Sequence, residues 1–188
     1  MPLGRWKKLS DSVVAQNPWW TYRCDRFELS SGKQGEYHYV HTLGSAMVVP
    51  VTDDGTLLLV KQFRYLMQRE SLEFPCGGIK SGATAEQTAS AELAEETGHM
   101  ASELELVGRF NPYNGVTDEI CHVFLGRGLR AAPGAKPDET EEFELLMLTA
   151  EDLDAHIQSG DIWDGMTMAA WQIVRAMLVP GARSFDSL

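Results

Sequence analysis

The clearest pattern of apolar and polar positions in the chain lies in residues 44–63. Apolar runs at residues 45–50 and 56–60 flank the polar turn Asp53-Asp54-Gly55. Two short apolar runs around an Asp-Gly turn are typical of a β-hairpin. We therefore predict that these runs form two strands joined by that turn.

Further strands are predicted along the chain, at residues 19–26, 37–42, 70–75, 104–109, 119–126 and 143–148. A segment rich in Gly and Pro at residues 126–137 predicts a loop. Helical patterns follow at residues 151–156 and 166–178. The second helix has an apolar stripe that should pack on the sheet, made of Ala169, Ala170, Ile173, Val174 and Met177.

The N-terminal segment, residues 10–44, has a patchier alternation around a polar turn at residues 30–35. We therefore do not expect it to fold alone. Its aromatic residues Trp19, Trp20 and Tyr22 admit two interpretations. They could stack on a nucleobase, or pack against the main domain or a second subunit, and we favour packing.

A short helix is predicted at residues 85–97. Thr84 is a suitable N-cap, the segment contains neither Pro nor Gly, and Gly98 supplies a left-handed stop. Ala85, Ala89 and Leu93 form its apolar stripe. The helix follows a glycine-rich stretch, residues 77–82, so the chain reads as a loop that leads into a helix.

Three glutamates of this helix crowd one side. Glu92, Glu95 and Glu96 are related by i,i+3 and i,i+4 spacing, which costs about 0.2–0.5 kcal/mol for each like-charged pair. A hard divalent cation such as Mg²⁺ would offset this cost, because it takes oxygen ligands from carboxylates and backbone carbonyls. The alternative is a solvated acidic face, but the preceding glycines favour the cation, since they let a carbonyl turn toward it.

The stretch from residue 77 to residue 98 resembles the Nudix box. That pattern has a Gly, five residues, Glu, seven residues, and then Arg-Glu-apolar-x-Glu-Glu-x-Gly-apolar. The positions that match in register are Gly77, Glu92, Leu93, Glu95, Glu96 and Gly98. Ala83, Ala91 and His99 stand where the pattern has Glu, Arg and an apolar residue.

The paired loss at positions 83 and 91 suggests a hypothesis. If Ala83 and Ala91 replace the two partners of one buried ion pair, the double change is nearly neutral, whereas one charge restored alone is costly. Ala91→Arg should then lower stability.

Four further segments look like the Nudix branch that cleaves ADP-ribose and other nucleoside diphosphate sugars. They are residues 62–64, 73–77, 111–119 with Pro112, and 165–170. The resemblance implies an α/β fold, the Nudix α/β/α sandwich with a mixed sheet. We expect a small N-terminal β extension over residues 1–43 and a hydrolase domain over residues 44–180.

The same resemblance implies roles for individual residues. Glu92 and Glu96 would bind the metal, with Glu95 close by and the backbone carbonyl of Cys76 as a further ligand. Arg64 would touch the substrate's diphosphate or terminal sugar.

Two further regions complete the implied site. Glu119 would belong to the substrate pocket or its metal shell. In the acidic segment 138–142, Glu139 would be the base that activates water, with Glu141 next. Mg²⁺ would be the cofactor, with Mn²⁺ as a substitute.

Composition limits the classes of partner. The chain has 188 residues, 44% of them hydrophobic, and a formal net charge of −11. This charge disfavours binding to nucleic acid or to an anionic membrane, which needs clustered Lys and Arg. A small phosphate-bearing ligand remains compatible with it if metal ions mask the local charge.

Three cysteines, Cys24, Cys76 and Cys121, are widely spaced and form no Cys-x-x-Cys pair. They suit a reducing compartment, and the start of the chain lacks an apolar signal core, so we expect a cytoplasmic protein. Cys76 as a nucleophile is an alternative that we disfavour, because no base is paired with it.

Two functions therefore compete. The first is a Mg²⁺-dependent hydrolase of a nucleotide sugar, assembled as a homodimer through its N-terminal region, as is common in this branch. The second is a Nudix-fold binding or sensor module that has lost turnover, which Ala83 and Ala91 support. We favour the hydrolase, because a degenerate module has little reason to keep Glu92, Glu95 and Glu96 together.

Overall fold

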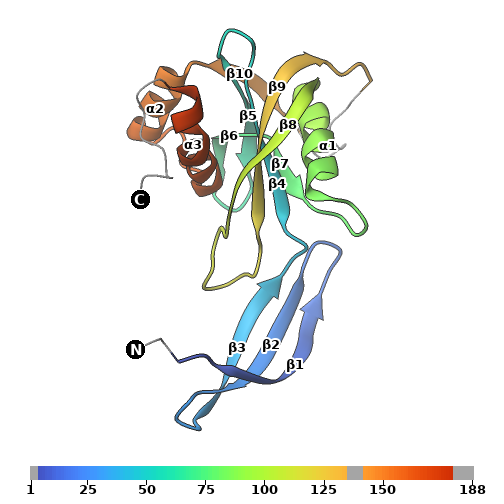
Figure 1. Cartoon of the computed structure of the whole chain (residues 1–188), viewed down its shortest axis with the longest axis vertical. Coiled ribbons are helices and arrows are strands. Elements are labelled where there is room, and N and C mark those ends of the chain that lie inside the picture. Colours follow the sequence, from blue (N-terminus) through green and yellow to red (C-terminus); the bar gives the residue numbers. More distant parts are fainter. Residues whose placement is uncertain (1–3, 135–141, 180–188) are drawn as a thin grey trace.

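Helices cover both faces of the central sheets in this protein, as Figure 1 shows. The computed structural model describes residues 4–134 and 142–179. Helix α1 (Ala85–Thr97) lies on one side, and α2 (Ala150–Ser159) and α3 (Gly165–Leu178) lie on the other. The predicted α/β/α fold is confirmed. Of the helices in the described ranges, none combines the length and apolar character needed to cross a membrane.

A separate antiparallel sheet precedes this body and projects from it (Figure 1). It consists of β1 (Lys7–Gln16), β2 (Thr21–Glu28) and β3 (Gln34–His41), in that order. Strands β2 and β3 were predicted, but β1 was not, because its residues are mostly polar and all exposed. The division into an extension over residues 1–43 and a domain over residues 44–180 stays a prediction.

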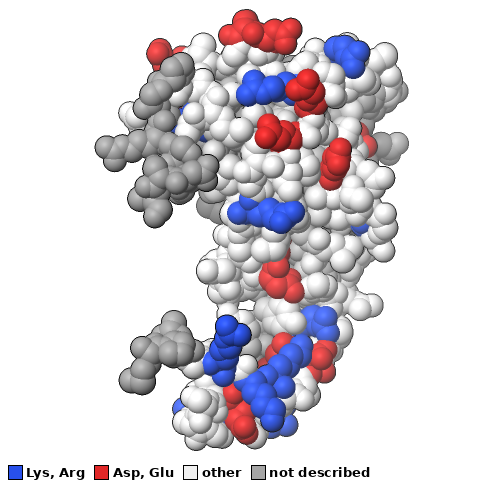
Figure 2. Space-filling model, in the orientation of Figure 1, with Lys and Arg blue, Asp and Glu red and all other residues white. Residues whose placement is uncertain are grey.

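Charged side chains of both signs line this N-terminal sheet, where a band of Lys and Arg is interleaved with Asp and Glu (Figure 2). Lys8 pairs with Asp25 at 2.9 Å, and Arg23 pairs with Asp11. These cross-strand pairs help to hold a sheet that has little apolar burial of its own.

In the described part of the main body, the strands form two sheets. The mixed sheet has the order β7 (Cys76–Gly78), β4 (Ser45–Pro50), β9 (Cys121–Ala131) and β8 (His99–Phe110), with β4 parallel to β9. The antiparallel sheet has the order β10 (Glu144–Leu148), β5 (Leu57–Arg64) and β6 (Arg69–Glu73).

The predicted hairpin of residues 45–60 is wrong in its pairing. Both strands and the turn exist, but β4 and β5 belong to different sheets. Next to the turn, Val51 forms an isolated bridge with Leu57, and the Thr52 N–H donates to the Thr56 carbonyl at 2.9 Å. Strand β4 is buried at every residue, because it has strand partners on both edges and helices over both faces. Continuous burial of this kind is typical of a central strand rather than a surface hairpin.

Strand β4 divides the core into two parts. Ala46 and Val48 pack with Ala89 and Leu93 of α1, while Met47 and Val49 belong to the larger cluster that contains residues of α2 and α3. Of the stripe predicted on α3, Ala170 and Val174 are fully buried, but Met177 is 48% exposed. Trp171, outside that stripe, is buried instead.

Two segments that were predicted as loops are found in strands. Residues 76–78 form β7, and β9 runs through residues 126–131, with Gly128 at a φ of +61°. Both segments contain glycine, which weakens a strand prediction, but their backbones pair with β4 and β8 respectively.

Candidate active site

Helix α1 carries the glutamates of the candidate site. Thr84 accepts a hydrogen bond from the backbone N–H of Gln87, whose side chain accepts one from the Thr84 backbone N–H. Gly98 ends the helix at a φ of +69°. Ala89 and Leu93 are fully buried, so the helix is anchored at a fixed rotation. The predicted caps and apolar stripe are confirmed.

The anchored helix places its acidic residues at the boundary of the core. Glu96 is buried, with 9% of its surface exposed, and Glu92 and Glu95 are half-buried. Their i,i+3 and i,i+4 spacing puts them on one side of the helix. Partial burial strengthens the mutual repulsion of like charges, which a bound cation would relieve.

The glycine stretch lies directly against Glu92. A Cβ atom on Gly77 would come within 2.0 Å of Glu92 Oε1 and 2.2 Å of Glu92 Cδ. Gly77 belongs to β7 and pairs with Ala46 of β4, so its backbone is fixed by the sheet. The backbone of the glycine stretch therefore packs directly against a helix carboxylate. Backbone carbonyl and carboxylate oxygens at such a contact are ligands that suit a hard divalent cation.

Cys76 precedes this contact and pairs with Met47 of β4. The Cys121 thiol, followed by burial, raises the pKa of the Cys76 thiol well above its ordinary value. The negative charges of Glu96 and Asp164 act in the same direction. Cys76 is therefore a neutral thiol at neutral pH, which argues against its action as a nucleophile. Its backbone carbonyl remains a candidate metal ligand.

Arg64 lies at the end of β5 and forms a fork with Glu73 of β6. Its Nε donates to Glu73 Oε1 at 2.7 Å, and a terminal nitrogen donates to Glu73 Oε2. Glu73 is 3% exposed, whereas the Arg64 side chain is 46% exposed. The hydrogen bond to Glu73 raises the pKa of Arg64. Sequence analysis missed Glu73 as a partner, although a strand glutamate near an Arg of the preceding strand was a usable signal.

The Arg64–Glu73 fork yields a prediction for stability. We expect Arg64→Ala to lower the free energy of unfolding by about 1–3 kcal/mol, because it leaves the buried Glu73 carboxylate with poorer partners. Denaturant unfolding measures this change. Lys61→Ala is the control on the same strand, since its partners are exposed and such pairs contribute less than about 1 kcal/mol. An equal decrease in the free energy of unfolding in both variants would show that the Arg64–Glu73 pair contributes no more than an exposed ion pair.

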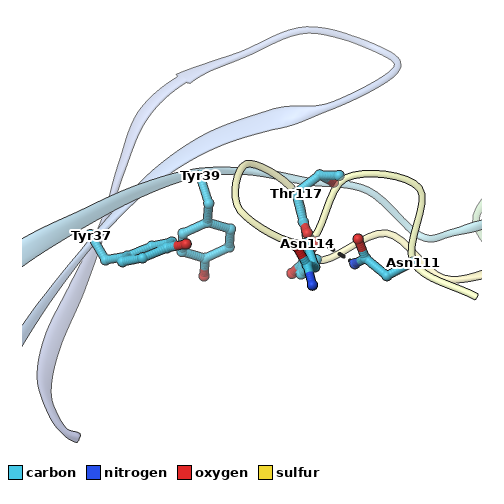
Figure 3. A pocket seen from close by; sticks show the side chains of 6 residues that line it. Tyr37, Tyr39, Asn111, Asn114 and Thr117 are labelled. Atoms are coloured by element: carbon cyan, nitrogen blue, oxygen red, sulfur yellow. Dashed lines mark hydrogen bonds between the residues drawn. The ribbon is translucent and has the colours of Figure 1, made fainter.

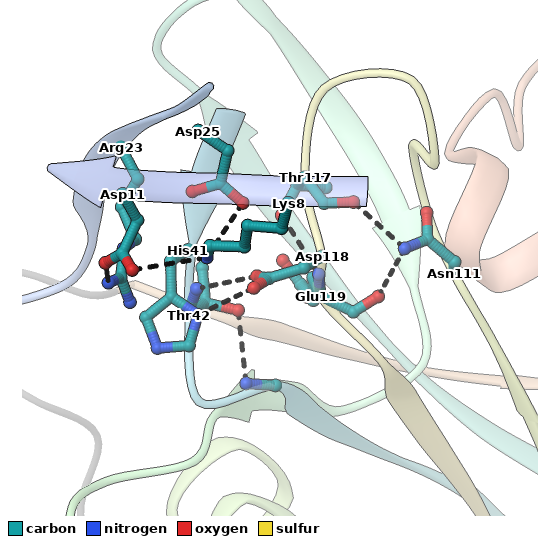
Figure 4. A network of polar contacts seen from close by, with 11 residues as sticks. Lys8, Asp11, Arg23, Asp25, His41, Thr42, Asn111, Thr117, Asp118 and Glu119 are labelled. Atoms are coloured by element: carbon teal, nitrogen blue, oxygen red, sulfur yellow. Dashed lines mark hydrogen bonds and ion pairs between the residues drawn. The ribbon is translucent and has the colours of Figure 1, made fainter. Parts of the chain in front are cut away.

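Glu119 is tied to the same end of the mixed sheet. Ser45 Oγ donates to Glu119 Oε1 at 2.6 Å, and Ser45 pairs with both Gly78 of β7 and Cys121 of β9. The Asn111 side chain donates to the backbone oxygens of Thr117 and Glu119 at 3.0 and 2.8 Å (Figure 4). Glu119 is therefore linked through one serine to the glycine stretch beside Glu92.

An open cavity of about 330 Å³ lies between β3 and the loop of residues 111–118, which directly precedes Glu119 in the chain. Tyr37 and Tyr39 line it from β3, and Asn111, Asn114, Thr117 and Asp118 line it from the loop (Figure 3). Two tyrosine rings with nearby amide and carboxylate groups suit a flat, polar ligand such as a nucleobase.

The structure does not bring all the predicted residues together. Glu139 and Glu141 lie outside the described residues. Within the described ranges, the one set of three candidate ligands whose atoms all lie within 4.8 Å of one another is on the N-terminal sheet, away from the helix glutamates.

The hypothesis about Ala83 and Ala91 does not agree with their burial. Ala91 is exposed and Ala83 is half-buried. A side chain at position 91 would keep its contact with water, so the two alanines do not replace a fully buried ion pair.

Ala91→Arg should therefore leave stability almost unchanged. We expect a change of less than about 0.5 kcal/mol in the free energy of unfolding, because the new charge is solvated and lies four residues before Glu95. Ala91→Gln, which adds length without charge, is the control in the same denaturant titration. A loss above about 3 kcal/mol in the Arg variant alone would restore the buried-pair hypothesis.

Comparison with known proteins places the chain in a family. The profile of the NUDIX domain family matches residues 41–168. The ADP-ribose pyrophosphatase of Bacillus subtilis strain 168 is 36% identical over 149 residues, which cover 79% of this chain and 80% of that protein. The methanol dehydrogenase activator of Bacillus methanolicus is 30% identical over 154 residues, covering 81% and 83%.

A solved structure supports the same fold. A crystal structure of an ADP compounds hydrolase superposes with a TM-score of 0.83 over 95% of this chain and 96% of that chain, at 22% identity. The fold is the Nudix fold, and the family match together with the pyrophosphatase relative makes this chain a Nudix pyrophosphohydrolase. This chain belongs to the Nudix family, and the resemblance predicted from its sequence is confirmed.

Proposed function

We propose that this chain is a Mg²⁺-dependent hydrolase that cleaves the pyrophosphate bond of ADP-ribose or a closely related nucleoside diphosphate sugar. The products are a nucleoside monophosphate and a sugar phosphate. The contact of Gly77 with the Glu92 carboxylate is the observation that carries this proposal. The relative named ADP-ribose pyrophosphatase supports the substrate.

The metal site in this proposal consists of oxygen donors. Glu92 and Glu96 hold the ion, with Glu95 close by and the Cys76 backbone carbonyl as a further ligand. Nudix hydrolases generally use a divalent metal, and Mg²⁺ or its substitute Mn²⁺ suits carboxylate and carbonyl oxygens. Such an ion neutralises diphosphate charge and lowers the pKa of bound water.

The substrate's two halves have separate partners. Arg64 contacts the diphosphate or terminal sugar with the guanidinium N–H groups that Glu73 does not occupy, and the pairing with Glu73 fixes the plane of the guanidinium. We assign Glu119 to the nucleoside half, because it directly follows the loop that lines the cavity with Tyr37 and Tyr39.

Glu139 is proposed as the base that accepts the proton of the attacking water, with Glu141 as the next candidate. We expect Glu139→Gln to lower turnover by about 10²–10⁴-fold, the usual contribution of a general base, without changing metal affinity. Steady-state kinetics and a Mg²⁺ titration measure the two quantities. If Glu139→Gln keeps full activity and Glu141→Gln does not, the base is Glu141.

A substrate panel tests the proposed function directly. The full chain is incubated with Mg²⁺ and ADP-ribose, GDP-mannose, UDP-glucose or a dinucleoside polyphosphate, and the released nucleotide is measured. We expect AMP and ribose 5-phosphate from ADP-ribose as the fastest reaction. Tight binding of one compound with no turnover of any would favour the alternative, a catalytically weakened Nudix sensor module, which is supported by Ala83 and Ala91.

A homodimer formed through the N-terminal sheet is part of the proposal. Strand β1 is exposed along its whole length, and Val13, Val14 and Trp19 are 54%, 53% and 79% exposed. An exposed edge strand with apolar side chains suits pairing with a second copy. Sedimentation analysis of the chain with and without Val14→Lys tests it.

A cytoplasmic location is also proposed, supported by three free cysteines.

A further inference from the structure

The N-terminal sheet brings together three side chains that the proposed reaction does not use. Cys24 of β2 and His38 of β3 are direct cross-strand partners, and Glu36 lies two residues before His38 on the same face. The distance from Cys24 Sγ to His38 Nε2 is 3.6 Å, and that from His38 Nε2 to Glu36 Oε2 is 3.8 Å. All three ligand atoms lie within 4.8 Å of one another.

These separations are close to those of ligands around one tetrahedral ion. Zinc bonds of about 2.3 Å to sulfur and about 2.0–2.1 Å to nitrogen put the two ligand atoms about 3.5 Å apart at tetrahedral angles. Nitrogen and oxygen ligands would be about 3.4 Å apart by the same reasoning. The Cys24–His38 distance already agrees, and a small rotation of the exposed Glu36 side chain would supply the rest.

A fourth residue orients the histidine. Tyr22 is two residues before Cys24 on β2, and its hydroxyl lies 3.1 Å from His38 Nδ1. This contact leaves Nε2 as the nitrogen that faces Cys24. Metal-ligating histidines almost always have their second nitrogen held in this way, which fixes the tautomer and the ring orientation.

We propose that Cys24, Glu36 and His38 form a Zn²⁺ site on the N-terminal sheet, with Tyr22 as its positioning residue. The types of ligand atom determine which metal is favoured. Thiolate and imidazole select zinc or a similar transition metal, whereas Mg²⁺ prefers oxygen donors alone. The site is therefore chemically distinct from the carboxylates of α1, and it does not depend on the proposed hydrolase function.

The ion would cross-link β2 to β3. The sheet has few buried apolar residues, and Glu36 and His38 are exposed, so a fourth position is open to water. Because the ligands come from two neighbouring strands, bound zinc stabilises their pairing, and the folded chain gains stability with zinc concentration.

The test uses Co²⁺ as a spectroscopic substitute for Zn²⁺ on the full chain, in excess Mg²⁺ to occupy oxygen-donor sites. We expect one equivalent of Co²⁺ to give thiolate-to-cobalt charge-transfer absorption and the strong visible bands of tetrahedral cobalt. Added Zn²⁺ should remove both signals. Zn²⁺ should also raise the melting temperature of the metal-free chain.

Variants assign the signal to residues. Cys24→Ser should abolish the charge-transfer band, and Tyr22→Phe should keep it while weakening affinity by about 10–100-fold. His41→Gln, on the same strand but outside the cluster, is the matched control and should bind as the unmodified chain does. If Cys24→Ser fails to fold, the exposed Glu36→Gln serves instead, with the band retained and affinity lowered at least about tenfold.

Two results would overturn the proposal. One is the absence of a sulfur-to-cobalt band in the unmodified chain. The other is a band that survives Cys24→Ser in a folded variant, because it would place the metal on Cys76 or Cys121.

Discussion

Glu96→Gln should reduce turnover of ADP-ribose by more than about 100-fold while leaving the chain folded. Loss of a residue that only supports a metal ligand costs about 10–100-fold, and loss of the ligand itself should cost more. Glutamine keeps the shape of the buried side chain, so we expect the free energy of unfolding to change by less than about 1 kcal/mol.

Glu86→Gln is the matched control for Glu96→Gln. Glu86 lies in the first turn of the same helix, where it is exposed and far along the axis from the candidate metal site. The two variants lose the same charge, so a difference in kcat, together with a loss of Mg²⁺ affinity in Glu96→Gln alone, assigns the effect to the site. Equal activity in both variants would remove Glu96 from the metal site.

Gly77→Ala should also abolish most activity, by about 100-fold or more, and for a different reason. The added methyl group would overlap the Glu92 carboxylate, whose nearest oxygen is 2.0 Å from the Cβ position. The carboxylate is the flexible end of a long side chain, so it moves aside instead of breaking the fold. A displacement of about 1 Å in a site that positions reacting groups costs about 10² in rate.

Gly78→Ala separates this effect from a general effect on the strand. A Cβ atom on Gly78 would meet nothing within 4 Å, although Gly78 belongs to the same short strand and pairs with Ser45. We expect near-normal kcat in this variant and similar melting temperatures in both. If Gly78→Ala were as inactive as Gly77→Ala, backbone freedom in β7 would explain the loss instead of contact with Glu92.

Local signals predicted the parts of the fold that depend on neighbours in the sequence. The caps of α1 follow from Thr84 and Gly98, whose hydrogen bonds lie within a few residues. The pairing of β4 did not follow from such signals, because its partners β7 and β9 come about 30 and 75 residues later. An Asp-Gly turn reports a reversal of the chain but not which edges the two strands then choose.

In the candidate site, too, local features could be predicted from the sequence and long-range contacts could not. Its acidic helix face could be recognised from spacing alone, since i,i+3 and i,i+4 relations are fixed by helix geometry. The Arg64–Glu73 fork and the Ser45–Glu119 bond join residues from different strands and loops. The exposure of Ala91, which contradicted a hypothesis drawn from a motif, depends on how α1 rests on the sheet.

The loop that carries Glu119 is fastened to the N-terminal sheet. Asp118 accepts a hydrogen bond from the Thr42 backbone and lies 2.7 Å from His41 Nδ1 (Figure 4), and Val40 donates to the Val116 carbonyl at 2.9 Å. A displacement of that sheet would therefore also move the backbone next to Glu119. Thermodynamic reciprocity then requires that a ligand which orders this loop also strengthens the attachment of the sheet, so the order of the loop and the position of the N-terminal sheet are energetically coupled.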